Sequence, residues 1–250
     1  MKYSIAVAAL LAGSAVAAPA AKLNAKQRLA QRNKNAASSN EDYNVSWAGA
    51  VLTGAAYTGV SASFPIPKPA VGTTGETSAS DFTASTWIGI DGYNCNNLWQ
   101  AGVDSTIEKS TGAVSYYAWY EWYPADTQVI DLGTLTAEDV ISVNLTTTSF
   151  NKGTIVMENK STGTSFTKIV SSTNTLCGVS AEWIMEDLSI DSSSIGLANY
   201  GSVVFSDAVA TTASKTVTPS GSEILDIETS SNAILTKTSV TDNSVTIAYV

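Results

Sequence analysis

The groups best suited to acid–base chemistry in this chain are carboxylates. The stretch AEWIMED, residues 181–187, places Glu182, Glu186 and Asp187 within six residues, and the 250-residue chain contains no histidine. A Ser-His-Asp or Cys-His triad and a histidine-based zinc site are therefore excluded. An enzyme with this sequence must use carboxyl groups as its general acids and bases, as many glycosidases and acid peptidases do.

The two cysteines, Cys95 and Cys177, are expected to form one disulfide in an oxidising compartment. It would close a loop of about 80 residues and contribute roughly 4 kcal/mol on a chain-entropy estimate. A catalytic thiol, the alternative, would have no histidine as its base. Asp91, Asn94 and Asn96 are spaced partly like calcium ligands, but the Gly and Glu of a calcium loop are missing, so we predict neither a metal nor another cofactor.

Short apolar and aromatic segments separated by turn residues follow one another from Ser46 onwards, without a convincing amphipathic helix after residue 40. This pattern predicts one all-β domain, an antiparallel β-sandwich of the jelly-roll or concanavalin-like kind with two large curved sheets. The predicted strands include WAGAVL, STWIGID, LWQAGVD, SYYAWYEWY, GTIVMEN, TSFTKIV, AEWIMEDL, GSVVFSDAV and SVTIAYV.

Strand alternation sorts the polar residues by face, because residues two apart in a strand point to the same side. In four segments it places aromatic side chains together with carboxylates or an amide. A sheet with such a face would form a substrate groove, although the solvated face of any sandwich also carries charges. The residues on these mixed faces are Trp87 and Asp91, Gln100 and Asp104, Tyr117, Trp119 and Glu121, and Glu182 and Glu186.

The first 40 residues differ sharply from the rest of the chain. Residues 1–17 combine Lys2, an apolar run and a small-residue ending, which is typical of a secretory signal peptide. Residues 18–40 are expected to be a basic propeptide, since residues 1–40 carry a net charge of +6 and residues 41–250 carry −15. A basic linker without a regulatory role is the alternative. We therefore expect a secreted, extracellular protein with a mature domain at 41–250.

The acidic composition bears on partners and conditions. A domain with this charge repels phosphates, so a nucleic-acid partner is not expected, and no later stretch reaches the about 18 apolar residues of a membrane span. The excess of carboxylates suits acid surroundings, where protonation relieves self-repulsion. We expect a monomer. Asn44, Asn144 and Asn159 begin N-glycosylation sequons, whose occupancy the sequence leaves open.

Several aromatic-rich strings, in this order and spacing, closely resemble the fungal glutamic peptidases, the eqolisin or G1 family. The resemblance extends from about Ser46 to Val250 and implies a β-sandwich acid endopeptidase that acts on polypeptides. It is carried by WAGAVL, WIGIDG, LWQAGVD, AWYEWYP, ENKSTG, AEWIMED and SVTIAYV.

The resemblance also implies site residues. Gln100 and Glu186 match the catalytic dyad, Trp87 and Asp91 match residues that help build the cleft, and Glu121 matches the surrounding hydrogen-bonded shell. The two cysteines match a family disulfide that ties the Gln-bearing segment to the Glu-bearing strand. Family members usually have Leu-Gln-Thr-Gly where this chain has Trp-Gln-Ala-Gly at 99–102, a change that bears on substrate preference.

The dyad has a simple chemical interpretation. Glu186 would take a proton from water and later give it to the departing amine, while the Gln100 amide would stabilise the oxyanion. Glu182 is the strongest competitor for Glu186 because it faces the same way four residues along the strand. Two other functions are weighed against the peptidase: a glycosidase that uses Glu182 with Glu186 or Glu121, and a lectin-like module without catalysis.

Overall fold

The structure is a computed structural model that describes residues 41–188 and 195–250. The expected signal peptide and basic propeptide lie outside these residues. Within the described residues the regular structure is entirely β-strand, as predicted, and no helix there is long and apolar enough to cross a membrane.

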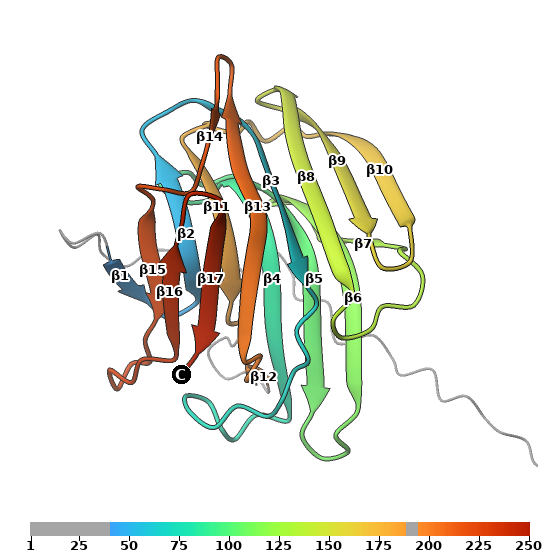
Figure 1. The fold of residues 1–250 in the computed structure, drawn as a ribbon, viewed down its shortest axis with the longest axis vertical. Helices are drawn as coiled ribbons and strands as arrows, with labels where there is room; N and C mark the ends of the chain where they lie inside the picture. The colour runs from blue at the N-terminus through green and yellow to red at the C-terminus, as the bar shows by residue number, and fades with distance from the viewer. Residues whose placement is uncertain (1–40, 189–194) are drawn as a thin grey trace, which may run out of the picture.

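Two large sheets lie face to face in layers (Figure 1). The nine-stranded sheet has the order β1 (Glu41–Asn44), β15 (Glu223–Ile227), β2 (Trp47–Thr53), β11 (Ser180–Glu186), β4 (Asp81–Asp91), β5 (Leu98–Glu108), β6 (Val114–Tyr123) and β7 (Gln128–Ile130), with β12 (Ile195–Leu197) beside β4. The eight-stranded sheet has the order β10 (Thr164–Ser171), β9 (Lys152–Asn159), β8 (Val140–Ser149), β3 (Tyr57–Pro65), β13 (Ser202–Thr212), β17 (Ser244–Tyr249) and β16 (Thr236–Val240), with β14 (Thr216–Val217) beside β13. Most pairs are antiparallel, and only β1–β15 and β4–β12 are parallel among the described strands.

The main hydrophobic core fills the space between the sheets. The central strands of both sheets contribute alternate residues to it, so the alternation read from the sequence is confirmed there. Trp183 and Met185 of β11 enter this core together with Phe64 of β3 and Phe205 of β13, and all four are fully buried. The other residues of β11 must therefore face the opposite side of the nine-stranded sheet.

Trp99 and Ala101, the positions where the chain departs from the Leu-Gln-Thr-Gly pattern, also point into this core. The indole of Trp99 packs at 5.0 Å from Trp122 and 5.9 Å from Tyr120, measured between ring centroids. Neither side chain can therefore contact a substrate on the outer face, so the structure gives no direct way for this departure to change substrate preference. These two side chains pack between the sheets and leave Gln100 on the outer face.

Candidate active site

The outer face of the nine-stranded sheet carries the predicted site residues in three rows across β11, β4, β5 and β6. Each row follows from the cross-strand register of the three strand pairs. The first row has an amide between carboxylates, the second has two tryptophans with an isoleucine and a glycine, and the third mixes carboxylates with hydroxyl groups. From β11 to β6 the rows are Glu182, Gly89, Gln100 and Glu121; Ile184, Trp87, Gly102 and Trp119; and Glu186, Ser85, Asp104 and Tyr117.

Glu186 lies at the last position of β11 and is fully buried. Two indole N–H groups donate to its carboxylate: Trp87 Nε1 to Oε2 at 3.0 Å and Trp47 Nε1 to Oε1 at 3.2 Å. The two indoles meet edge to face, with ring centroids 4.9 Å apart. Hydrogen bonds from two donors favour the ionised carboxylate, which is the form that a general base needs.

Gln100 is held from the neighbouring strand. Its Nε2 donates to Glu121 Oε2 at 2.5 Å, and Thr127 Oγ1 donates to the other oxygen of Glu121 at 2.9 Å. The amide oxygen of Gln100, Oε1, is buried without a hydrogen-bond partner among the described residues. Glu121 therefore fixes the orientation of the amide, while one N–H of Nε2 and the whole of Oε1 remain available for a ligand.

Asp104 occupies the third row between two donors. Ser85 Oγ donates to its Oδ1 at 2.5 Å, and Trp119 Nε1 donates to the same oxygen at 2.7 Å. Asp104 is thus built into the outer face as the sequence predicted, on the β5 side of Glu186 with Ser85 between them.

Gln100 and Glu186 stand on a diagonal of this face. One strand separates β11 from β5, and the two rows are four residues apart along β4. At ~4.8 Å between strands and ~3.4 Å per residue, their α-carbons are roughly 16 Å apart. Both side chains stand on the same outer face, since strand side chains project roughly perpendicular to their sheet. Trp87 lies at the midpoint of the diagonal.

Glu182, the competitor identified in the sequence, is also fully buried on this face. It lies in the same row as Gln100, with only Gly89 between them. Its Oε1 lies 3.2 Å from the position that a Cβ on residue 89 would take. By register alone Glu182 is nearer to Gln100 than Glu186 is, whereas Glu186 is the one that receives both indole N–H groups. The two carboxylates must be separated by experiment.

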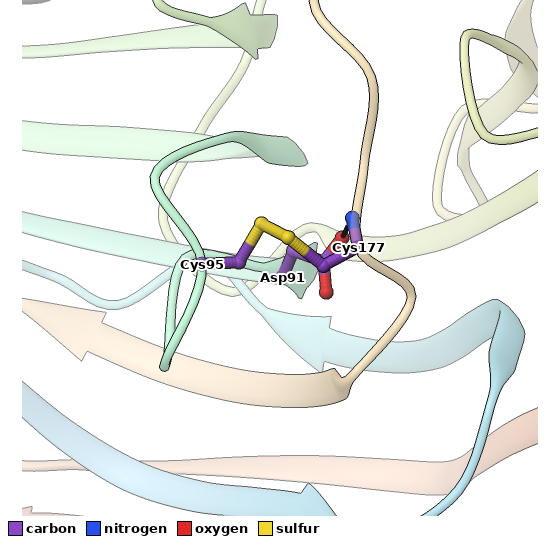
Figure 2. Close-up of side chains that lie close together, drawn as sticks. All are labelled: Asp91, Cys95 and Cys177. Carbon is purple, nitrogen blue, oxygen red and sulfur yellow. Dashed lines mark hydrogen bonds between the residues drawn. A yellow bond between two sulfur atoms is a disulfide. The ribbon is translucent and has the colours of Figure 1, made fainter.

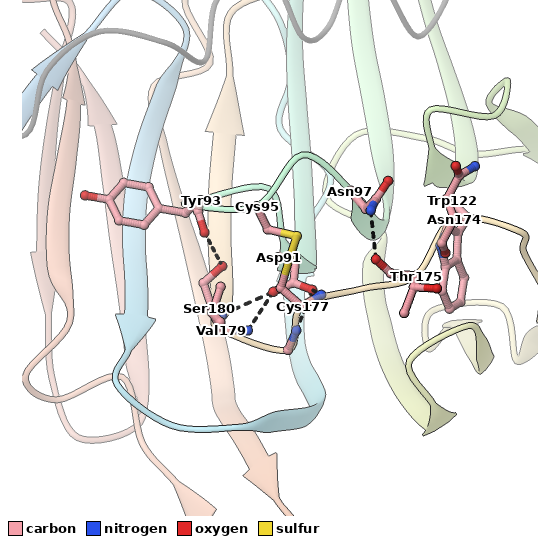
Figure 3. Close-up of a disulfide and its surroundings, with 11 residues drawn as sticks. Asp91, Tyr93, Cys95, Asn97, Trp122, Asn174, Thr175, Cys177, Val179 and Ser180 are labelled. Carbon is pink, nitrogen blue, oxygen red and sulfur yellow. Dashed lines mark hydrogen bonds between the residues drawn. A yellow bond between two sulfur atoms is a disulfide. The ribbon is translucent and has the colours of Figure 1, made fainter.

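Asp91 is the predicted site residue that the structure does not bring into these rows. Its φ of 70° ends β4, and its carboxylate accepts hydrogen bonds from the backbone N–H groups of the segment leading into β11. Figure 3 shows this arrangement. The donors are Cys177 at 2.6 Å, Gly178 at 2.7 Å, Val179 at 2.7 Å and Ser180 at 3.4 Å. Burial raises the pKa of Asp91, and these four N–H groups oppose part of that rise. Its contacts give Asp91 a structural role.

The predicted disulfide is present beside Asp91. Cys95 and Cys177 are bonded with their α-carbons 6.2 Å apart, and the bond joins the β4–β5 loop to the start of β11 (Figure 2). These three residues are also the one group within the described residues that has the spacing of metal ligands. Both sulfurs are consumed by the disulfide, so the group offers no thiolate to a metal.

Two residues of the site were not singled out in the sequence. Trp47 reaches Glu186 across 139 positions of the chain, and Thr127 supports Glu121 from the loop after β6. Trp47 opens the WAGAVL string, so its place in a mixed aromatic strand was a usable signal. Thr127 lies in an ordinary polar loop, and nothing in its neighbourhood marks it.

Comparisons with known proteins identify the family. The model of the Peptidase A4 family matches residues 45–249. Aspergillopepsin-2 of Aspergillus niger is 39% identical over 227 residues, which cover 84% of this chain and 79% of the relative. The crystal structure of scytalido-glutamic peptidase with a transition state analog inhibitor is similar with a TM-score of 0.72 at 29% identity, covering 82% of this chain and 98% of that one.

The aspergilloglutamic peptidase from Aspergillus niger gives a TM-score of 0.63 at 41% identity, covering 68% of this chain and 99% of that one. The family match covers the described β-sandwich from β2 to β17, including the four strands that carry the three rows. With the carboxylate–amide face already in place, the chain therefore belongs to the Peptidase A4 family, the glutamic peptidases, and is an acid endopeptidase that hydrolyses polypeptides.

Proposed function

We propose that Gln100 and Glu186 are the catalytic dyad of this peptidase. The observation that carries the proposal is the matched support of the two groups. Two indole N–H groups hold the Glu186 carboxylate, and Glu121 holds the Gln100 amide on the same face. Trp87 lies between them and donates a hydrogen bond directly to Glu186.

In the first step Glu186 removes a proton from a water molecule, and the water oxygen bonds to the scissile carbonyl carbon. The carbonyl π electrons move to its oxygen, which becomes an oxyanion. The second N–H of Gln100 Nε2 donates to this oxyanion, while the first remains on Glu121. Because Glu121 fixes the amide in advance, the donor need not reorganise as the charge develops.

In the second step the protonated Glu186 gives its proton to the amide nitrogen of the substrate. The C–N bond breaks, the oxyanion electrons restore the carbonyl, and the products are a carboxylic acid and an amine. Glu186 returns to its ionised form. Gln100 does not titrate, so one group carries the proton and the other stabilises charge.

The dyad is tested with three variants of the secreted protein: Glu186→Gln, Gln100→Ala and, as the matched control, Glu182→Gln. All three remove a buried group of the same face, and Glu182 lies four residues from Glu186 on the same strand. Loss of one oxyanion donor typically lowers kcat by about 10²- to 10³-fold, so Gln100→Ala should fall at least that far with a denatured protein as substrate at acid pH.

We expect Glu186→Gln to lose activity more completely, because no other group replaces the proton acceptor, and Glu182→Gln to retain most of it. Thermal unfolding of each variant shows whether it is folded. An active Glu186→Gln with an inactive Glu182→Gln would assign the base to Glu182. Full activity in Gln100→Ala would refute the dyad.

We further propose that the protein is a secreted, extracellular monomer made as a precursor, with a signal peptide at 1–17, a propeptide at 18–40 and a mature domain at 41–250. Residues 18–40 carry a net charge of +5 and residues 41–250 carry −15. This contrast supports a propeptide that blocks the acidic active site by charge pairing near neutral pH and dissociates as carboxylates protonate.

A synthetic peptide of residues 18–40 should therefore inhibit the mature domain at about pH 6, where carboxylates are ionised, and less at acid pH. Salt should weaken the inhibition because exposed charge pairs are screened. No inhibition at low salt would refute the charge-pairing mechanism. N-terminal sequencing of the secreted protein and its elution volume on a sizing column test the cleavage site and the monomer.

A further inference from the structure

The structure separates the three N-glycosylation sequons, which look equivalent in the sequence. An Asn-X-Ser/Thr site can carry a glycan in the folded protein only where the amide nitrogen, Nδ2, points to solvent with room around it. Asn44 lies at the end of β1, Asn144 in the middle of β8 and Asn159 at the end of β9.

Asn159 is fully buried, and both the nitrogen and the oxygen of its amide make hydrogen bonds. Its Nδ2 donates to Asp139 Oδ2 at 3.0 Å, and its Oδ1 accepts from the backbone N–H groups of Ser161 at 3.0 Å and Thr162 at 3.3 Å. These bonds form the turn between β9 and β10. A sugar on Nδ2 would require this turn to open, so a chain glycosylated here would not reach the native fold.

Asn44 is half-buried and its amide is folded over the turn into β2. Its Nδ2 donates to the backbone oxygen of Trp47 at 2.7 Å, and its Oδ1 accepts from the N–H groups of Ser46 at 2.9 Å and Trp47 at 2.7 Å. The amide of Asn44 thus positions the backbone of Trp47, whose indole donates a hydrogen bond to Glu186. The nitrogen faces the chain rather than solvent.

Asn144 has the opposite surroundings. Its neighbours Val143 and Leu145 are fully buried in the core, so Asn144 points out of the eight-stranded sheet, and it is exposed. Its side chain makes no hydrogen bond to another described residue, so attaching a sugar would break none. Thr146, the third residue of the sequon, is exposed on the same face.

The residues paired with Asn144 leave room for a sugar. The pairing partner on β3 is Ser61, a small side chain, and the partner on β9 is Val156, which is 41% exposed. An exposed valine next to the attachment point offers apolar surface to the face of a pyranose ring. Figure 1 shows β8 between β3 and β9 in the front sheet, while the strands with the three rows belong to the other sheet.

We propose that Asn144 is an N-glycosylation site of this protein and that Asn44 and Asn159 remain unmodified. The donor is an oligosaccharide linked to a lipid pyrophosphate. Asn144 Nδ2 bonds to C1 of the first N-acetylhexosamine as the C1–O bond to pyrophosphate breaks; the lipid pyrophosphate leaves with that electron pair, and the amide proton passes to a base. The proposal rests on the secretion proposed above, because the donor is met on that route.

The glycan lies on the outer face of the eight-stranded sheet, and the dyad lies on the outer face of the other sheet, with the core between them. The sugar therefore covers a face that substrates do not use. Removing it from the folded enzyme should leave kcat/KM unchanged within about twofold, since no contact of the site is altered.

The experiment expresses the full chain behind a yeast secretion leader, which brings it to the glycosylation machinery whether or not its own first residues do so. Intact mass is measured with and without endoglycosidase, on protein from the medium and from the cells. The variants are Asn144→Gln, Thr146→Val, which destroys the sequon while keeping a β-branched side chain, and Thr146→Ser, which preserves the sequon.

One glycan is expected on the parent chain and on Thr146→Ser, and none on Asn144→Gln or Thr146→Val. A parent chain without a glycan, or a glycan that persists in Asn144→Gln, would overturn the proposal. The readout is a mass, so it is independent of peptidase activity and of which residues form the dyad.

Discussion

Replacing Trp87 with phenylalanine separates a hydrogen bond from ring packing at the centre of the site. The substitution removes the Nε1 donor that lies 3.0 Å from Glu186 Oε2 and leaves an aromatic ring over the sheet. A hydrogen bond to a charged group is worth about 1.5–3 kcal/mol. Because this bond is made to the ionised carboxylate, its loss should lower the ionised fraction of Glu186 at a given acid pH, and kcat/KM should fall by up to about 10- to 150-fold on the acid limb and by less above it.

The pH profile gives a second, independent readout. With one donor fewer on the ionised carboxylate of Glu186, proton uptake becomes easier, and the acid limb of kcat/KM should move to higher pH. Trp47 still donates at 3.2 Å, so the carboxylate keeps one indole and the limb should move without activity vanishing. A stopped assay with a fluorogenic peptide across the acid range measures both effects.

The matched control is Trp183→Phe on the same strand as Glu186. The Trp183 indole faces the core, where its Nε1 donates to the backbone oxygen of Ser61 at 3.1 Å. Its loss should lower the unfolding temperature while leaving kcat/KM and the acid limb in place. Equal kinetic effects of the two substitutions, or an unmoved acid limb in Trp87→Phe, would refute the reasoning that Trp87 acts through the carboxylate.

Three further predictions concern stability and packing. Replacing both Cys95 and Cys177 with serine should lower the free energy of unfolding by about 4.5 kcal/mol, from the chain entropy of a closure across 82 positions; a loss below about 1 kcal/mol in urea unfolding would contradict it. Burial raises the pKa of Asp226, so the native state holds its proton to higher pH than the unfolded state does. This contribution to stability is complete below the ordinary Asp value of about 3.9 and is lost as pH rises through the raised folded value. Asp226→Asn should therefore flatten the fall in unfolding temperature from acid toward neutral pH, and an unchanged slope would exclude Asp226 as its source. A Cβ on residue 89 would stand 2.9 Å from Cζ3 of Trp87, so Gly89→Ala should displace the indole. We expect kcat/KM to fall even where the unfolding temperature shows that the variant is folded. Wild-type kinetics in a folded variant would show that the ring adapts.

The strands and their faces were predictable because alternation is a local property of an extended backbone. The segments read as β4, β5, β6 and β11 lie close to their observed bounds, and the residues that alternation assigned to the apolar face, such as Ile88, Val103 and Trp183, lie in the core between the sheets. Gln100, Asp104 and Glu186 were placed on the outer face by this rule alone. The disulfide also followed from composition, since two cysteines in an oxidising compartment have one pairing.

Strand alternation gave the wrong surroundings for Asp91. Alternation from Trp87 assigned it to the outer face, but a positive φ ends the strand at that residue and turns the carboxylate toward backbone N–H groups 86 to 89 positions away. No window of sequence around Asp91 contains those donors. Trp47 and Thr127 were missed for a related reason, because each acts on a partner contributed by a different strand.

The sequence by itself determined the chemistry that is available: an acidic β-sandwich without histidine, with carboxylates and one glutamine on aromatic faces. Only the tertiary structure decided which of these groups become neighbours. Strand register is set by hydrogen bonds between segments far apart in the chain, and it places Glu182 in the row of Gln100 and Glu186 in the row of Asp104. The two indoles that converge on Glu186 from β2 and β4 distinguish it from Glu182, because only the folded sheets bring those donors to one carboxylate.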